Sequence, residues 1–518
     1  MKKTMVLSGI VLALCLTFVG CEDATSASDS WTPEPLPPLT GTVNITGNLW
    51  VGQVLSVDVS GLGGDTGVIS YRWNDVAGLG VTSSTYTTVV GDAGNQITVT
   101  VTRSGFSGNV TSAPVTIAAT APEFTVPGDN LAERFAWLRE NAESNRPYLV
   151  TIGANETLSP AQAALPTSVS GVTITLRGSG VGERTVTLSE NGNLFTLGFG
   201  ITLVLDNNVT LHGTATNNNH LVRINSGGTL VMNSGSAITG NTNTSTVAAD
   251  AGGGVRVNGG GTFTMNGGRV SGNAATPATG TNGNGGGVFI ASGSPGAVFN
   301  MGGGEISDND AGNDGGGVFI AWAGTGGRTG TFTMGGGTIF ENSAGGDGGG
   351  VFVGDGTLDG AGFVMEGGTI RDNSAVLDGG GVGLATGVFG RAEFDMNAGQ
   401  ISDNTAGGTG GGVNVGSRGI FNMRGGTIAG NGASSGGGVF VAMTVMGFEG
   451  GRFQISSGTI NGGTGTNANT AATGAALHLG GTGAVGQRGT FAATGAFSSL
   501  GTLSTTNDTI QVANGVLQ

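Results

Sequence analysis

Three aspartates at nearly regular spacing are the side chains of this sequence best suited to bind a ligand. Asp314, Asp347 and Asp378 each stand immediately before a Gly-Gly-Gly-Val run, 33 and 31 residues apart. If each interval forms one coil of a stacked fold, the carboxylates lie about 4.8 Å apart. Like charges at that distance favour bound protons or a divalent cation. Calcium, held by these aspartates, is therefore the only cofactor that the sequence suggests. Otherwise they are solvated turn residues.

Three phenylalanines complete a candidate binding face beside these aspartates. Phe289, Phe319 and Phe352 follow the valine of three glycine runs. Strand alternation turns them outward when the flanking Val and Ile point inward. An exposed aromatic stripe next to acids could stack against sugar rings or receive a protein partner. In the alternative, which we favour, the variable loops fold back over the phenylalanines, including the loop that carries Trp322.

A long internal repeat would position these side chains. Each unit reads GGGV-x-[IVL], a variable loop, F-x-M-x-x-G-x-[IV], and then a short polar segment that ends in Asn. Three short strands with glycine or asparagine corners are typical of one coil of a parallel β-helix. The sequence therefore predicts an all-β protein in which residues 147–518 form a right-handed parallel β-helix of about eleven coils.

The asparagine that closes each unit predicts a ladder of side-chain amides along the solenoid axis. Stacked coils would place these amides one above another, each bonded to the next. The predicted ladder consists of Asn241, Asn273, Asn309, Asn342, Asn373, Asn404 and Asn431.

Two smaller elements are expected ahead of the solenoid. Residues 41–120 contain short β-branched runs separated by glycine-rich turns, which predict a small antiparallel sandwich with Trp73 in its core. Residues 121–146 comprise a linker and a capping helix within 129–143. Asp129 is the predicted N-cap, and Leu131, Phe135 and Leu138 share one helix face.

The first 40 residues indicate export and anchoring. Residues 1–20 combine Lys2 and Lys3 with an apolar run, as a secretory signal does. The segment Phe-Val-Gly-Cys that ends at Cys21 resembles a bacterial lipobox, which implies lipidation of Cys21. Residues 21–40 are acidic and then proline-rich, as expected of a flexible tether. We expect a membrane-anchored lipoprotein of the outer membrane, at the cell surface or on its periplasmic face.

Several stretches together resemble a known family. GVISYRW and STYTTVVGDAGNQITVTVTRSG are similar to bacterial immunoglobulin-like modules. With the signal, ERTVTLSENGNLFTLG and the GGGV array, they resemble spirochaetal repeat lipoproteins. The GGG-V and I-x-x-N pair is also similar to repeats of chlamydial polymorphic outer-membrane proteins, which are adhesin-like. The resemblance implies an immunoglobulin-like sandwich followed by a parallel β-helix.

Parallel β-helices also include polysaccharide lyases and hydrolases, so an enzyme is the alternative function. Such lyases need an Arg or Lys base beside calcium-binding acids, and such hydrolases need clustered aspartates. The only lysines are in the signal, and His212, His220 and His478 are isolated in the sequence. No catalytic residue is assigned, and a non-catalytic protein is favoured.

Charge narrows the range of partners. The chain has 19 Lys and Arg against 34 Asp and Glu, for a net charge of −15. Nucleic-acid binding needs a basic stripe that this sequence lacks. Together with the lipobox and the lack of catalytic motifs, this charge balance favours a lipid-anchored repeat protein for surface adhesion or envelope interaction. We expect it to be a monomer. Its expected partners are the membrane and a host or envelope protein or glycan.

Overall fold

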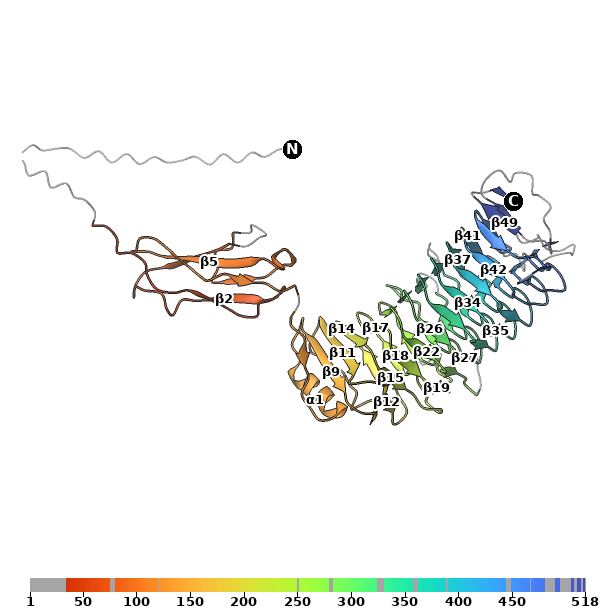
Figure 1. Ribbon diagram of the computed structural model, residues 1–518, viewed down its shortest axis with the longest axis horizontal. Coiled ribbons are helices and arrows are strands. Elements are labelled where there is room, and N and C mark those ends of the chain that lie inside the picture. Colours follow the sequence, from red (N-terminus) through yellow and green to blue (C-terminus); the bar gives the residue numbers. More distant parts are fainter. Residues whose placement is uncertain are drawn as a thin grey trace, which may run out of the picture. The chain divides into compact units, whose positions relative to one another are not determined.

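The computed structural model describes residues 34–74, 80–119, 121–248, 251–278, 283–323, 330–356, 362–387, 390–443, 449–465 and 467–479, together with the backbone of four short strands after residue 489. The chain divides into two compact units between Ala119 and Thr120 (Figure 1). We call the first the N-terminal unit and the second the solenoid.

The N-terminal unit is built from two antiparallel sheets that share one hydrophobic core. Trp73 lies in that core with 2% of its surface exposed, and its ring stacks on Tyr86 at 5.4 Å between centroids. One sheet contains β1 (Asn44–Thr46), β2 (Val54–Asp58) and β4 (Thr85–Thr87), and the other contains β3 (Ile69–Asn74), β5 (Gln96–Arg103), β6 (Val110–Thr111) and β7 (Val115–Thr116). A 3-10 turn, η1 (Val90–Asp92), follows β4.

Helix α1 (Leu131–Asn141) caps the first coils of the solenoid. Leu131, Phe135 and Leu138 are fully buried, as the shared face predicted. The N-cap is Asn130 and not Asp129, because the Asn130 side chain accepts a hydrogen bond from the backbone N–H of Glu133. The sequence placed the cap one residue too early.

Three long sheets and one short sheet make up the solenoid. Sheet A contains β8 (Phe124–Thr125), β9 (Pro147–Ile152), β11 (Val172–Gly178), β14 (Ile201–Leu205), β17 (Thr229–Met232), β21 (Thr262–Met265), β25 (Val298–Met301), β29 (Thr331–Met334), β33 (Phe363–Met365), β37 (Glu393–Met396), β41 (Ile420–Met423), β44 (Arg452–Ile455) and β47 (Thr490–Ala493). Because β8 pairs in parallel with β9, sheet A includes a strand ahead of the expected start at residue 147.

Sheet B carries the strand that precedes each ladder asparagine. It contains β10 (Glu156–Leu158), β12 (Arg184–Leu188), β15 (Val209–His212), β18 (Ser236–Thr239), β22 (Arg269–Ser271), β26 (Glu305–Ser307), β30 (Thr338–Phe340), β34 (Thr369–Arg371), β38 (Gln400–Ser402), β42 (Thr427–Ala429), β45 (Gly458–Ile460), β49 (Ile510–Ala513) and β50 (Val516–Leu517).

Sheet C carries the Gly-Gly-Gly-Val strands. It contains β13 (Phe195–Leu197), β16 (Val222–Ile224), β20 (Val255–Val257), β24 (Val288–Ile290), β28 (Val318–Ile320), β32 (Val351–Val353), β36 (Val382–Leu384), β40 (Val413–Val415), β43 (Val439–Val441), β46 (Leu477–Leu479) and β48 (Thr505–Thr506).

Sheet D lies between sheets B and C in chain order and was not foreseen. Its two-residue strands are β19 (Thr242–Asn243), β23 (Ala274–Ala275), β27 (Asp310–Ala311), β31 (Ser343–Ala344), β35 (Ser374–Ala375) and β39 (Thr405–Ala406). Each of the central coils therefore has a fourth short strand besides the three that the repeat predicted.

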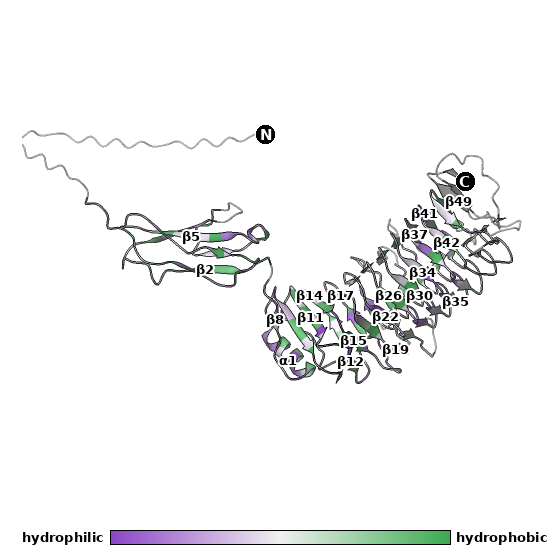
Figure 2. Cartoon of the chain, in the orientation of Figure 1, coloured by the Kyte–Doolittle hydropathy of each residue, from purple (hydrophilic) through white to green (hydrophobic). Residues whose placement is uncertain are grey.

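Identical residues stack in register through the core. The phenylalanines of sheet A stack from coil to coil. Between Phe263 and Phe453, the ring centroids of each successive pair are 4.5 to 5.0 Å apart. The methionines two residues later pair in the same way. Apolar residues recur along the stacked strands in Figure 2. The fixed offset of these residues in every repeat thus produces one continuous core.

The glycine triplet allows coils to approach closely at the corner before sheet C. Gly348 has φ +69°, and a Cβ there would lie 2.6 Å from the Val351 carbonyl oxygen. A Cβ on Gly349 would lie 2.4 Å from the Ser374 carbonyl oxygen of the next coil. Only glycine accommodates both the left-handed backbone and this contact.

The parallel solenoid has about nine turns, fewer than the eleven expected. Antiparallel pairing replaces parallel stacking near the C-terminus, where β48 pairs with β46 and β49 pairs with β45. Among the weak motifs near the C-terminus, β46 and β47 still pair in parallel with β43 and β44, whereas β48 and β49 do not extend the parallel stack.

Candidate functional site

The seven asparagines predicted to form a ladder are all buried at the corner after sheet B. From Asn273 onward, each Nδ2 donates to the Oδ1 of the next coil's asparagine at 2.9 to 3.1 Å. Two residues outside the predicted set extend this row: Asn217 donates to Asn241, and Asn469 accepts from Asn431. Because these amides bond to one another and to backbone carbonyls, the row holds the coils together.

The aspartates before the glycine triplets form a second row, which we call the carboxylate ladder. The Oδ1 atoms of Asp314, Asp347 and Asp378 accept hydrogen bonds from the backbone N–H groups of Asp347, Asp378 and Thr409, at 2.8, 3.0 and 2.6 Å respectively. Asp314 is only 9% exposed. These carboxylates are therefore not the freely solvated turn residues that the sequence offered as an alternative to calcium ligands.

Burial changes the acidity of two aspartates, Asp314 and Asp347. It raises the pKa of Asp314 above its usual range. Burial is also the main cause that raises the pKa of Asp347 to about 6, and the charges of Asp314 and Asp378 act in the same direction. A hydrogen bond from the Asp378 backbone partly opposes the rise. The Asp347 carboxylate, with its pKa of about 6, is therefore protonated when the pH falls slightly below neutral.

The geometry of the carboxylate ladder gives no direct sign of a metal centre. Among the described residues, no group of three or more His, Cys, Asp or Glu side chains is arranged to hold a metal ion. One oxygen of each ladder aspartate already accepts a backbone N–H. Calcium binding by Asp314, Asp347 and Asp378 stays a prediction from the sequence.

The three phenylalanines of the candidate binding face are buried, as in the alternative that the sequence favoured, so the exposed aromatic stripe does not form. Phe289, Phe319 and Phe352 are 6%, 0% and 3% exposed. Trp322, in the loop after β28, packs its ring edge-on against Phe319 and Phe352 at 5.0 and 5.5 Å between centroids. The Arg256 guanidinium carbon lies 4.2 Å from the centroid of the Phe289 ring. The buried stripe is therefore not available to stack on sugars.

A different row of acids is exposed on the solenoid. Asp308, Glu341, Asp372 and Asp403, which we call the acidic ribbon, each precede a ladder asparagine and are exposed. All four have positive φ, between 54° and 58°. Glycine occupies the same position before Asn241, Asn273 and Asn431, also with positive φ. Of the four acids, Asp372 forms an ion pair with Arg371 at 2.5 Å.

The three histidines each make their own local contacts. His212 Nδ1 is 3.1 Å from the Thr239 hydroxyl. His220 is buried, and its Nε2 accepts a hydrogen bond from Arg223 at 3.0 Å. His478 stacks on Phe440, and burial lowers its pKa. The structure does not bring these histidines together.

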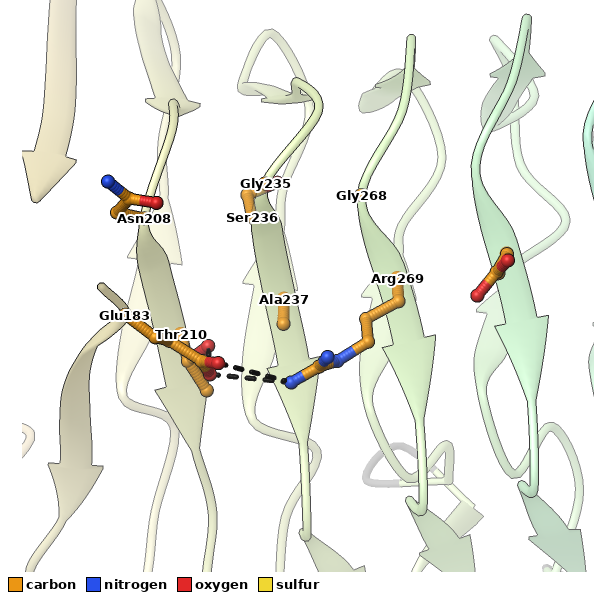
Figure 3. Close-up of a pocket in the computed structure, with 9 residues that line it drawn as sticks. Glu183, Asn208, Thr210, Gly235, Ser236, Ala237, Gly268 and Arg269 are labelled. Atoms are coloured by element: carbon orange, nitrogen blue, oxygen red, sulfur yellow. Dashed lines mark hydrogen bonds and ion pairs between the residues drawn. The ribbon is translucent and has the colours of Figure 1, made fainter. Parts of the chain in front are cut away.

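A polar groove of about 460 Å³ lies on sheet B in the first half of the solenoid (Figure 3). Its floor is made of small residues, among them Ser236, Ala237 and Gly268. Glu183 and Arg269 form an ion pair at 3.3 Å across Ala237, although 86 residues separate them in the chain. The Thr210 hydroxyl donates a hydrogen bond to the Glu183 carboxylate.

Sequence reasoning missed this groove because its residues do not recur. Glu183 belongs to an early, irregular coil, whereas Arg269 and Glu305 occupy equivalent positions on β22 and β26. The available signal was the run Gly235-Ser236-Ala237, which lacks the long outward side chains of neighbouring coils. Its meaning emerges only when strand pairing places Thr210, Ala237 and Arg269 in one outward row.

The signal, Cys21 and most of the tether lie outside the described residues. Within the described part of the chain, no helix combines the length and apolarity needed to cross a bilayer. In comparisons with known proteins, no family model, curated protein or solved structure matched this chain.

Proposed function

We propose that the protein is an exported, lipid-anchored and non-catalytic scaffold whose solenoid presents a repetitive surface for adhesion or envelope interaction. The acidic ribbon is the observation that carries the proposal. Four consecutive coils expose one carboxylate each at the same corner. Such an array suits a partner with repeated positive groups, because many weak contacts add up when they are linked.

The backbone of the acidic ribbon supports a role beyond folding. Glycine takes positive φ without a steric cost, and three equivalent corners use it. Non-glycine residues at positive φ cost about 1 kcal/mol, although Asp tolerates this region better than most. At Glu341 the fold alone would favour glycine. The exposed carboxylate there contributes nothing to the core, which is consistent with a use at the surface.

Retention of the purified full chain on isolated bacterial envelope and on a panel of host matrix proteins tests this proposal. The variant combines Asp308→Asn, Glu341→Gln, Asp372→Asn and Asp403→Asn. A matched control neutralises four exposed acids elsewhere, through Asp65→Asn, Glu123→Gln, Glu140→Gln and Glu190→Gln. We expect the ribbon variant to lose salt-sensitive retention while the control keeps it. Equal retention by both would overturn the role of the ribbon.

A carbohydrate-active enzyme is the second candidate function, and the groove on sheet B favours it. Glu183, Arg269 and Glu305 bring two carboxylates and a guanidinium to one hollow. Glycoside hydrolysis uses such carboxylates as acid and base. Depolymerisation assays on glycans, with and without calcium, test this candidate. Product release that Glu183→Gln abolishes would favour the enzyme over the scaffold.

A further inference from the structure

The groove on sheet B is hollow because its floor carries small side chains between long ones. Thr210, Ala237, Arg269 and Glu305 follow one another in the same outward row on β15, β18, β22 and β26. Ala237 contributes only a methyl group, and Gly235 and Gly268 contribute none. A volume of about 460 Å³ falls within the range of small-molecule sites, which is roughly 300 to 1,000 Å³.

Of the three charged side chains that line the groove, two are ion-paired with each other and one is not. Arg269 turns toward Glu183, with its Nη2 3.3 and 3.5 Å from the two carboxylate oxygens. Glu183 also accepts the Thr210 hydroxyl, so its carboxylate is held from two sides. Glu305 neighbours Arg269 on the next strand but has no ion pair with any described residue. The lining therefore has a net charge of −1, and its unpaired carboxylate is Glu305.

The chemistry of the lining defines a ligand class. Two carboxylates and one already paired guanidinium repel an anionic ligand such as a uronate. An amine would instead gain a charge-assisted hydrogen bond to Glu305. The remaining polar groups are two hydroxyls, an amide and backbone edges, which suit a hydroxylated ligand better than the aliphatic stem of a lysine. We propose that this groove binds a short saccharide that carries a protonated amine, with the amine at Glu305.

This inference does not depend on the acidic ribbon or on adhesion, since Asp308 is the ribbon residue nearest in sequence to Glu305 and none of the ribbon residues lines the groove. Titration calorimetry of the full chain with a glucosamine disaccharide, and with its N-acetylated counterpart, tests the ligand class. We expect saturable binding of the amine form and at least tenfold weaker binding of the acetylated form, because acetylation removes the charge.

Three variants locate the site. Glu305→Gln keeps the shape of an exposed side chain and should weaken binding of the amine form about tenfold. Ala237→Leu fills the floor and should abolish binding. Glu140→Gln removes the same charge from an exposed position on α1, outside the groove and the ribbon, and should leave binding unchanged. Thermal unfolding of each variant verifies the fold, and Glu305→Gln remains informative if Ala237→Leu unfolds.

Three results would overturn the proposal. The first is the absence of saturable binding by the parent chain. The second is equal affinity of the parent and Glu305→Gln for the amine form, or equal affinity of the parent for the amine and acetylated forms. The third is equal weakening by Glu140→Gln, which would show that overall negative charge, rather than the groove, attracts the amine.

Discussion

Replacing Asn373 with leucine removes one rung of the asparagine ladder while keeping a side chain of similar size. Asn373 Oδ1 accepts from both the backbone N–H and the Nδ2 of Asn342, at 3.0 and 2.9 Å. Its Nδ2 donates to the Ile339 carbonyl oxygen and to Asn404 Oδ1, at 3.0 and 2.9 Å. Leucine can make none of these four bonds, and the site is 1% exposed, so water cannot replace them.

The expected loss of stability follows from the groups left without partners. The Asn342 backbone N–H loses its side-chain acceptor, and the Ile339 carbonyl loses its amide donor. Each buried orphan costs about 1 to 3 kcal/mol. Burial of the leucine side chain returns about 1.5 to 3 kcal/mol. From the middle of these ranges we expect a net destabilisation of about 1 to 3 kcal/mol. It should be concentrated in the two neighbouring coils because repeats couple mainly to their neighbours.

Hydrogen exchange is the most direct assay, because it reports the Asn342 amide itself. We expect faster exchange at Asn342 in Asn373→Leu, together with a lower denaturation midpoint. Asn300→Leu is the matched control: Asn300 is exposed on β25, so the same change should alter stability by less than about 0.5 kcal/mol. An Asn342 amide that stays protected in Asn373→Leu, or equal midpoints for both variants, would refute the reasoning.

Three further predictions address other parts of the chain. Because the pKa of Asp347 rises from 3.8 to about 6 on folding, its contribution to stability is complete below about pH 4 and is lost as pH rises through 6. Asp347→Asn should thus be more stable than the parent by about 1 to 3 kcal/mol at pH 7.5 and equal near pH 4, and parallel pH profiles of the unfolding midpoint would contradict the desolvation of Asp347. Phe319→Ala should destabilise by about 3 to 5 kcal/mol in denaturant titration, as a buried ring does, whereas a loss below about 1 kcal/mol would mean that the ring is exposed. Cys21→Ser should move the protein from the detergent phase to the aqueous phase, and continued partition into detergent would require another anchor.

The repeat made much of the fold predictable, because equivalent offsets must stack on equivalent offsets. Phe332 and Met334 each recur at a fixed offset in successive units, and both point into the core. Asn342 recurs at another offset and bonds to its equivalents. The error at the helix cap was local: Asp129 and Asn130 are both good caps, and only the backbone shows that the Asn130 side chain reaches Glu133.

Features that depend on loops or on single coils could not be predicted in this way. Alternation gives the direction of Phe319 from its strand, but the burial of Phe319 depends on where the loop carrying Trp322 packs. The groove depends on Ala237, whose equivalents in neighbouring coils are Thr210 and Arg269. A repeat motif describes what the coils share, so it does not show the residues in which a single coil differs.

This contrast indicates where specificity can reside in a solenoid of this kind. Positions that repeat in every coil, such as Asn342, are committed to hydrogen bonds or packing between coils and have no free group to offer a ligand. Glu341, directly before it, is exposed and could be glycine without loss of the turn. Ala237 and Glu305 likewise depart from their neighbours without disturbing the stacking. Binding functions are therefore best sought at exposed departures from the repeat, since the stacked columns constrain every other side chain.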